Sequence, residues 1–417
     1  MRAYVHGFYG ALNVGDEAIC KAIVEGLRRF GRYLDITVGT RELAVSRSFT
    51  HTDARLMQGF YPTVNYWWRF PHHVYRIARS NILIIGGGGL FQDVHGWTMI
   101  CRYMLSACLG ILLDCPVVIL GAGAGPVNRP WVRRLMGTVC SLMNAIYVRN
   151  PVNKKVLIEC GVRPELVEVR TDLVPSLPLE QWVESRRRPS NPPRRIAFAL
   201  RKWPGLNEEG VVKLWEALSR QGCTIDLLCY EDEQDKIFYE SLLAQCTESC
   251  RRQITVRIPK TLQEAVADVA AADFMVSMRL HGCIFGAYLG IPLLAMPYHT
   301  KVRVFMEEAG MAGQLRPLAK AGEHWVEDIR QIASRYAEMP NGLNDALQHL
   351  RTKASQSFDD AMAVARRDGA PKKSAPFEAK VKALSIAIVL VFVGIAKESL
   401  HVLDYVRRKV IHLPRRT

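Results

Sequence analysis

Basic side chains recur in this sequence directly after short apolar runs. Arg279 and His281 follow one such run, and Arg149, Arg201 and Lys301 stand at or after others. The guanidinium group of arginine offers a planar fork of N–H donors that suits phosphate and carboxylate. Histidine titrates near neutral pH and can therefore exchange protons during a reaction. Together these residue types predict a binding site for a small anion, with an acid or base beside it.

Three glycine-rich segments also follow apolar runs, at Gly7–Glu17, Gly86–Asp93 and Gly121–Pro126. Because glycine has no Cβ, a ligand can approach the backbone N–H groups there. None of the segments has the spacing of a dinucleotide-binding motif or a P-loop. The residues in these segments that we expect to contact a ligand are Gly10, Asn13, Asp16, Gly87, Gly88 and Gly123.

Three polar residues in these segments allow different interpretations. Asp16 or Asp93 could orient a substrate hydroxyl group. Asn13 and Asp16 are equally suited to cap the helix that follows them, because short polar side chains accept hydrogen bonds from the first backbone N–H groups of a helix. The sequence leaves these interpretations open.

The elements that must position these residues alternate between short apolar runs and longer helical segments, which is the α/β pattern. Ligands of such folds bind at the carboxyl ends of strands and between domains. In the first half, strands are predicted at 3–9, 81–85, 116–120 and 145–148, and helices at 16–30, 97–113, 130–143 and 151–160. In the second half, strands are predicted at 196–200, 224–229, 254–257, 273–276 and 292–296, and helices at 208–221, 233–246, 261–271 and 281–289.

The segment 186–195 separates these two halves. It contains five Arg and three Pro residues in ten positions, which is typical of a linker rather than a packed element. We therefore expect an N-terminal domain over 1–185, a C-terminal domain over 196–365 and a tail over 366–417.

The chain is basic, with 55 Lys and Arg residues against 40 Asp and Glu residues and a net charge of +15 over 417 residues. Its composition excludes a disordered chain, a fibrous protein and a protein with many membrane spans. Almost half of the excess charge lies in 371–417, where ten basic residues face three acidic ones. A surplus of this kind favours anionic partners. Basic and aromatic residues do not interleave in a nucleic-acid-binding module, so no nucleic acid partner is expected.

The eleven cysteines show no CxxC pair and no zinc-ligand spacing. We expect no metal site and interpret the cysteines as buried, reduced thiols in a cytoplasmic protein. The polar–apolar pattern begins at Ala3, so no signal peptide is predicted.

The tail contains an apolar run of 14 residues, Ala383–Ala396, with Lys382 and Lys397 beside it. A helix of that length measures about 21 Å, which is short of the ~30 Å hydrocarbon core of a bilayer. Two interpretations stay open: attachment to a membrane surface, and packing as a soluble helix. The basic groups at 407–409 and 415–416 would favour an anionic leaflet.

The order of these motifs resembles that of the polysaccharide pyruvyl transferase family over residues 1–315. The resemblance implies two Rossmann-like domains of the glycosyltransferase-B type that face an interdomain crevice. It also implies transfer of pyruvate from phosphoenolpyruvate to two hydroxyl groups of a sugar, with a cyclic ketal as the product. The matching residues are Gly7–Glu17, Gly86–Asp93, Gly121–Pro126, Tyr147–Arg149, Ala199–Pro204, Ala272–His281, Gly290–Pro292 and Tyr298–Val302.

The resemblance extends to roles for single residues. His281, Arg279 and Asp93 are expected to be catalytic, with His281 as an acid or a phosphate contact. Phosphoenolpyruvate is the donor substrate, and no cofactor or metal is expected. The residues expected to hold this donor are Arg149, Arg201, Leu280, Lys301 and the glycine-segment residues named above. The sequence departs from the family pattern at Asn150, where an acid is usual, and at His299 and Thr300, which stand where the family has Asp-Pro.

The expected acceptor is a sugar of a polysaccharide or of a lipid-linked precursor, in the cytoplasm or at the cytoplasmic face of the membrane. Two alternatives remain. One is a glycosyltransferase of the same fold that uses a nucleotide-sugar donor. The other is a non-catalytic, anion-binding protein of an envelope assembly.

Overall fold

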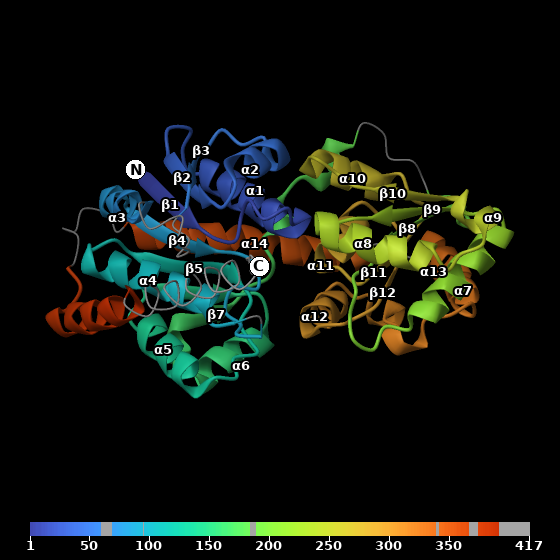
Figure 1. Cartoon of the computed structure of the whole chain (residues 1–417). Coiled ribbons are helices and arrows are strands. Elements are labelled where there is room, and N and C mark those ends of the chain that lie inside the picture. Colours follow the sequence, from blue (N-terminus) through green and yellow to red (C-terminus); the bar gives the residue numbers. More distant parts are fainter. Residues whose placement is uncertain (60–68, 95, 184–188, 339–341, 367–373, 392–417) are drawn as a thin grey trace, which may run out of the picture.

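The computed structural model describes residues 1–59, 69–94, 96–183, 189–338, 342–366 and 374–391. Two α/β domains, each built on a parallel sheet, lie side by side (Figure 1). This arrangement confirms the α/β class expected from the alternation of apolar runs and helices.

The N-terminal sheet contains seven described strands in the order β3-β2-β1-β4-β5-β6-β7, all paired in parallel. Helices cover both faces of the sheet, so β4 and β5 are buried along their whole length, as is usual for parallel strands. The strands are β1 (Arg2–His6), β2 (Asp35–Thr40), β3 (Arg55–Gln58), β4 (Ile82–Gly86), β5 (Val117–Ala122), β6 (Ala145–Val148) and β7 (Val167–Val169). The helices are α1 (Val14–Arg28), α2 (Leu43–Thr50), α3 (Phe70–Arg79), α4 (Thr98–Leu112), α5 (Pro130–Cys140) and α6 (Pro151–Glu159).

The C-terminal sheet contains five described parallel strands in the order β10-β9-β8-β11-β12. The strands are β8 (Arg195–Ala199), β9 (Thr224–Leu228), β10 (Ile254–Arg257), β11 (Phe274–Ser277) and β12 (Leu293–Ala295). The helices are α7 (Glu208–Arg220), α8 (Asp232–Leu243), α9 (Glu248–Arg251), α10 (Leu262–Ala270), α11 (Leu280–Tyr288), α12 (Thr300–Glu308) and α13 (Trp325–Glu338). Short 3-10 helices lie at η2 (Pro164–Leu166), η3 (Val174–Ser176), η4 (Leu179–Trp182), η5 (Ala312–Gln314) and η6 (Leu318–Lys320).

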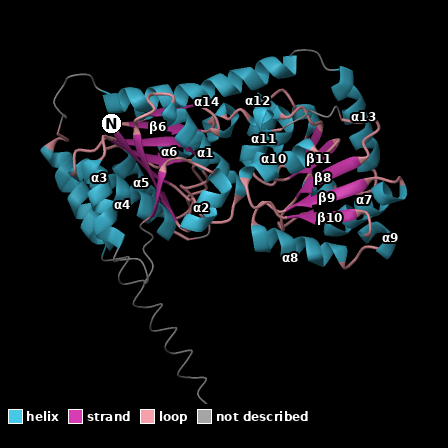
Figure 2. Cartoon of the chain, turned by 90° about the horizontal axis from the view of Figure 1, so that it is seen from above, coloured by secondary structure: helices cyan, strands magenta, loops and turns pink. Residues whose placement is uncertain are grey.

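A long helix, α14 (Gly342–Arg366), follows the second domain but packs largely on the first (Figure 2). The Phe358 ring lies against Gly26 of α1, and Asp360 pairs with Arg170 at 2.6 Å. The same helix also reaches the C-terminal domain, where the Tyr288 hydroxyl donates to Leu347 O at 2.7 Å. The sequence places 342–365 in the C-terminal domain, whereas in the structure this stretch joins the two domains.

The predicted linker 186–195 lies partly outside the described residues. Its second half is held by one buried carboxylate, because the backbone N–H groups of Ser190, Arg194 and Arg195 donate to Asp273 at 2.8, 3.0 and 2.9 Å. The linker therefore ends in a fixed position at the start of β8.

The described part of the tail is helical over 377–391 and packs on the N-terminal domain. The Lys380 Nζ and Ala375 N–H groups bind the Asp114 carboxylate at 2.7 and 2.8 Å, just beyond the end of α4. The remainder, 392–417, lies outside the described residues. None of the described helices has both the length and the apolarity that crossing a membrane requires. All eleven cysteines are buried thiols, as their apolar contexts predict.

Candidate active site between the two domains

The first turn of α1 meets the C-terminal domain directly. Asn13 Nδ2 donates to Glu231 Oε1 at 2.9 Å, and Val14 N donates to Tyr230 O at 3.0 Å. Asn13 is also the cap of α1, since its Oδ1 accepts from Gly15 N and Asp16 N. The sequence leaves Asn13 and Asp16 as alternative caps, and the structure assigns this role to Asn13.

His281 lies at the start of α11 and reaches across to the N-terminal domain. Its ring packs so closely on Gly15 that a Cβ at that position would collide with it. Its Nε2 atom lies 3.7 Å from Asp172 Oδ2, and the His281 side chain is only 13% exposed. Burial lowers the pKa of His281, although Asp172 counteracts the effect by favouring the charged ring. His281 is therefore neutral near pH 7 before any ligand binds.

Asp172 joins His281 to Arg149. Its Oδ2 atom lies 3.2 Å from Arg149 Nε, which also donates to Gly121 O at 2.9 Å. Burial alone would raise the pKa of Asp172, but Arg149 and His281 hold that pKa well below its ordinary value. Asp172 is thus a fixed negative charge between two of the predicted ligand-binding residues. It is not among the residues predicted from the sequence.

Three polar atoms of this cluster are buried and have no hydrogen-bond partner within the described chain. They are the Nη2 atom of Arg149, the Oδ2 atom of Asp172 and the Nε2 atom of His281. Buried polar atoms are normally hydrogen-bonded, and unpaired ones gathered in one place are typical of a site that receives a ligand. The structure brings Arg149 and His281 together at this place, and their expected role in binding the donor stays a prediction.

Asp16 lies beside the same cluster and is only partly exposed. One of its oxygens packs against Gly88, where an added Cβ would come within 2.8 Å of it. Burial raises the pKa of Asp16 to about 7, with Arg149 and Lys301 lowering it and Glu231 and Asp172 raising it. A carboxyl group with this pKa is present in both protonation states near neutral pH, as an acid–base catalyst requires.

Arg279 has a different environment from the one the sequence predicts. Its guanidinium is buried and pairs with Asp235, and its NH1 lies 3.3 Å from Glu231 Oε1. The pKa of Arg279 is raised, because the two carboxylates outweigh the effect of burial. Arg201 completes the group, with its NH2 3.7 Å from Glu231 Oε2. Arg279 therefore orders an ion cluster, and its expected catalytic role stays a prediction.

The start of α12 supplies the last basic group. His299 caps this helix, with its Nδ1 accepting from Lys301 N at 3.3 Å, so it performs the capping role that an aspartate would also suit. Burial lowers the pKa of His299 to about 4, helped by Lys301 and Arg149. The Lys301 ammonium lies 5.7 Å from the Tyr298 ring centroid. Lys301, Arg279 and Arg201 together lower the pKa of Tyr298 against the effect of burial.

The predicted glycines fall into two groups. Gly88 lies beside Asp16, and Gly123 joins Gly88 by donating its N–H to Gly88 O at 2.8 Å. Gly87 has φ +63° and packs on Ile19, and Gly10 has φ +73° and donates its N–H to Glu17. Packing therefore accounts for the last two. A ligand contact stays a prediction for all four, as it does for Leu280, which is buried at the start of α11.

Asp93, which follows β4, is fully engaged by the loop between β5 and α5. Its carboxylate accepts from Asn128 N at 2.9 Å and Arg129 N at 2.8 Å, and Arg129 NH1 lies 3.5 Å away. These hydrogen bonds and Arg129 lower the pKa of Asp93 against the effect of burial. These contacts are those of a residue that holds a loop, and the catalytic role expected for it stays a prediction.

A family model of polysaccharide pyruvyl transferases matches residues 13–300, which is more than half of the chain. The chain belongs to the polysaccharide pyruvyl transferase family. The matched region runs from the cap of α1 to the start of α12 and includes Arg149, Asp172 and His281. Membership of this family makes the protein a transferase, and it confirms the resemblance found in the sequence.

Several solved structures have the same fold as this chain. HepE of Anabaena, in complex with UDP-glucose, aligns with a TM-score of 0.57 and 12% identity over 88% of this chain and 97% of that one. A putative UDP-N-acetylglucosamine 2-epimerase of Listeria monocytogenes aligns with a TM-score of 0.56 and 13% identity over 87% and 95%. Identities this low show the fold alone, which is two Rossmann-like domains of the glycosyltransferase-B type. No protein with a curated description matches the chain.

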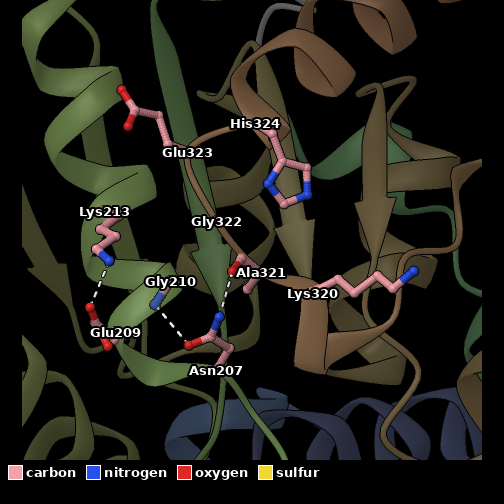
Figure 3. Close-up of a pocket in the computed structure, with 9 residues that line it drawn as sticks. All are labelled: Asn207, Glu209, Gly210, Lys213, Lys320, Ala321, Gly322, Glu323 and His324. Atoms are coloured by element: carbon pink, nitrogen blue, oxygen red, sulfur yellow. Dashed lines mark hydrogen bonds and ion pairs between the residues drawn. The ribbon is translucent and has the colours of Figure 1, made fainter.

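The protein also has a cavity of about 430 Å³ away from this site, in its C-terminal domain (Figure 3). The cavity lies beside the start of α7, where Asn207 bonds to Gly210 N at 3.0 Å and Ala321 O at 2.9 Å, and Lys213 pairs with Glu209 at 2.6 Å. Because these polar groups satisfy one another, the interdomain cluster is the stronger candidate for chemistry.

Glu216, Cys246 and Cys250 bring possible metal-ligand atoms within 4.8 Å of one another in the same domain. The Glu216 carboxylate already accepts from Thr247 N at 2.6 Å and from its hydroxyl at 2.9 Å. This hydrogen bonding accounts for the Glu216 position as a contact to the start of α9. The expectation that the protein needs no metal stays a prediction.

Proposed function

We propose that the protein transfers a pyruvyl group from phosphoenolpyruvate to two hydroxyl groups of one sugar in a polysaccharide or lipid-linked precursor. The products are a cyclic pyruvate ketal and phosphate. One observation carries the proposal. In a chain of this family, Arg149 and His281 come from different domains to one buried site, where both lie beside Asp172 and Arg149 Nη2 has no hydrogen-bond partner among the described residues.

The donor is anionic at both ends, with a phosphate and a carboxylate. Arg149 NH2 and the Lys301 ammonium supply charged donors for these groups, and Arg201 lies further along the same cluster. Charge-assisted hydrogen bonds of this kind are about twice as strong as neutral ones. Because Arg149 and Lys301 belong to different domains, the donor would hold the domains together when it binds.

His281 is suited to become an acid only after the donor binds. Its pKa is lowered in the unliganded protein. A phosphate next to the ring favours the charged form and raises the pKa again. The protonated His281, held by Asp172, can then donate to the departing phosphate or to the methylene carbon of the donor.

Asp16 is suited to be the base. Above its pKa of about 7 the carboxylate can take the proton of an attacking sugar hydroxyl. In the proposed sequence, the methylene carbon gains a proton and the enol carbon becomes an oxocarbenium-like centre. The first hydroxyl attacks this carbon, phosphate departs, and the second hydroxyl closes the ketal. Of the two hydroxyl protons released, one balances the proton gained by the methyl group and the other leaves with phosphate.

The test is phosphate release from phosphoenolpyruvate against a panel of free and lipid-linked oligosaccharides, with detection of the ketal by mass spectrometry. We expect release with at least one acceptor, and its loss in Arg149→Ala and His281→Ala. Near-normal turnover in both variants would contradict the proposal that this site transfers the pyruvyl group. Saturable binding of a UDP- or GDP-sugar, with no phosphate release, would favour the nucleotide-sugar alternative.

A further inference from the structure

The tail helix 377–391 buries only part of its apolar surface. Ala383, Ala387 and Leu390 pack into the N-terminal core, and Lys380 fixes the helix to Asp114. These contacts seat the helix on the domain beside the end of α4. The helix therefore belongs to the folded surface of the protein.

A second apolar face of the same helix points to solvent. Phe377, Val381, Leu384 and Ile388 are 82%, 46%, 50% and 47% exposed. They are spaced by four, three and four residues, so they form one continuous stripe along the helix. We call these four residues the tail stripe. An apolar stripe on a well-seated surface helix is typical of a docking surface rather than of scattered exposed residues.

The positive charge of the tail sequence indicates which partner the tail stripe would bind. The sequence from 371 to 417 carries ten basic and three acidic residues. Two copies of the protein docked through the tail stripe would bring two strongly basic tails together, and this repulsion disfavours self-association. An anionic lipid surface complements the same charge, at about 1 kcal/mol per basic residue near the surface.

The length of the helix determines how it would lie. The described helix 377–391 measures about 22 Å, against the ~30 Å core of a bilayer. An amphipathic helix with basic neighbours lies in the plane of the interface, with its apolar residues between headgroups and acyl chains. The helix 377–391 can lie in this way, because one side of it packs on the protein and the tail stripe lies on the side that faces solvent.

We propose that the helix 377–391 docks the protein on an anionic membrane surface through the tail stripe. The docking is peripheral and does not depend on the reaction proposed above.

The full chain should be tested by flotation with vesicles of phosphatidylcholine alone and of phosphatidylcholine mixed with phosphatidylglycerol. We expect flotation with the mixed vesicles, less flotation as salt rises, and at least about tenfold weaker binding for Leu384→Gln/Ile388→Gln. The matched control is Ile237→Gln, which replaces an exposed apolar residue of α8 in the C-terminal domain, away from the tail stripe, and should bind like the original chain.

Circular dichroism should show that both variants are folded, since the substituted side chains are exposed. Equal flotation of the double variant and the control would overturn the proposal. So would a dimer in solution that the double variant makes monomeric, without vesicle binding by either form, because the tail stripe would then serve a second copy of the chain.

Discussion

Asp172 Oδ2 of the N-terminal domain lies 3.7 Å from Nε2 of His281 in the C-terminal domain. The pair brings a fixed carboxylate from one half of the molecule to the titrating ring of the other. Because the same carboxylate also binds Arg149, it sets the position of two of the groups proposed to bind the donor.

Asp172→Asn tests the positioning role of this carboxylate. Its negative charge favours the protonated ring, so its removal should lower the His281 pKa further. We expect kcat/KM to fall by about tenfold to a hundredfold, with the chain still folded. An NMR titration of the His281 ring, assigned with His281→Ala, measures the pKa change. An unchanged His281 titration together with unchanged kcat/KM would show that the pair has no such role.

Asp16→Asn tests the base. Because the Asp16 pKa is raised to about 7, activity that needs its ionised form should rise with pH through about 7. The variant should lose kcat by about a hundredfold or more and lose this step in the pH profile. A step that persists in the Asp16→Asn variant would belong to another group.

The same substitution has an expected effect on stability. A raised carboxyl pKa means that the folded state binds the proton more tightly than the unfolded state, so stability falls as pH rises from about 4 to about 7. Asp16→Asn removes this loss, and its melting temperature should exceed that of the original chain at pH 8 but not at pH 4. Calorimetry at both pH values measures the difference, and an equal shift at both would contradict the linkage.

Arg279→Ala tests the ion cluster of the C-terminal domain. It would leave Asp235 and Glu231 without their buried cation, which should cost about 3–5 kcal/mol of unfolding free energy. The control is Arg252→Ala, whose exposed pair with Glu248 should contribute less than about 1 kcal/mol. Urea unfolding measures both. Equal stability of the two variants would show that the buried cluster contributes no more than a surface pair.

Gly15→Ala tests the contact between domains without changing a charge. The added Cβ would collide with the His281 ring and displace it. We expect at least about tenfold lower kcat/KM with little change in folding. Gly313→Ala is the matched control, because a Cβ at Gly313 would meet no atom within 4 Å. The measurement is kcat/KM of the two variants. Equal values would mean that displacement of the His281 ring does not affect activity.

Much of the fold was predictable because buried parallel strands are continuous apolar runs. The runs at 81–85, 116–120 and 196–200 correspond to β4, β5 and β8 within a residue or two. Strands β2, β3 and β7 were not predicted. The last of these is only three residues long, and only its pairing with β6 makes it a strand.

The position of Arg149 and His281 just after strands was predictable from the sequence, and their roles stay a prediction. The position of Asp172 was not predictable, because the strand before it went unrecognised. Glu231 and Asp235 were missed for another reason. Their importance comes from pairing with Arg279, which lies more than forty residues away in the sequence, and no local pattern reports such a contact. Their position after the run 224–229 is the signal that could have pointed to them.

The path of α14 limits how the two halves can move. The chain passes from the first domain to the second before β8 and returns before α14 packs on α1. Two crossings tie the domains together more closely than a single tether would. Because His281 and Asp172 belong to different domains, a relative motion of the domains would change the distance between them. The distance between these two residues is therefore a natural gauge of opening and closing, which a spectroscopic label on each domain could follow through a catalytic cycle.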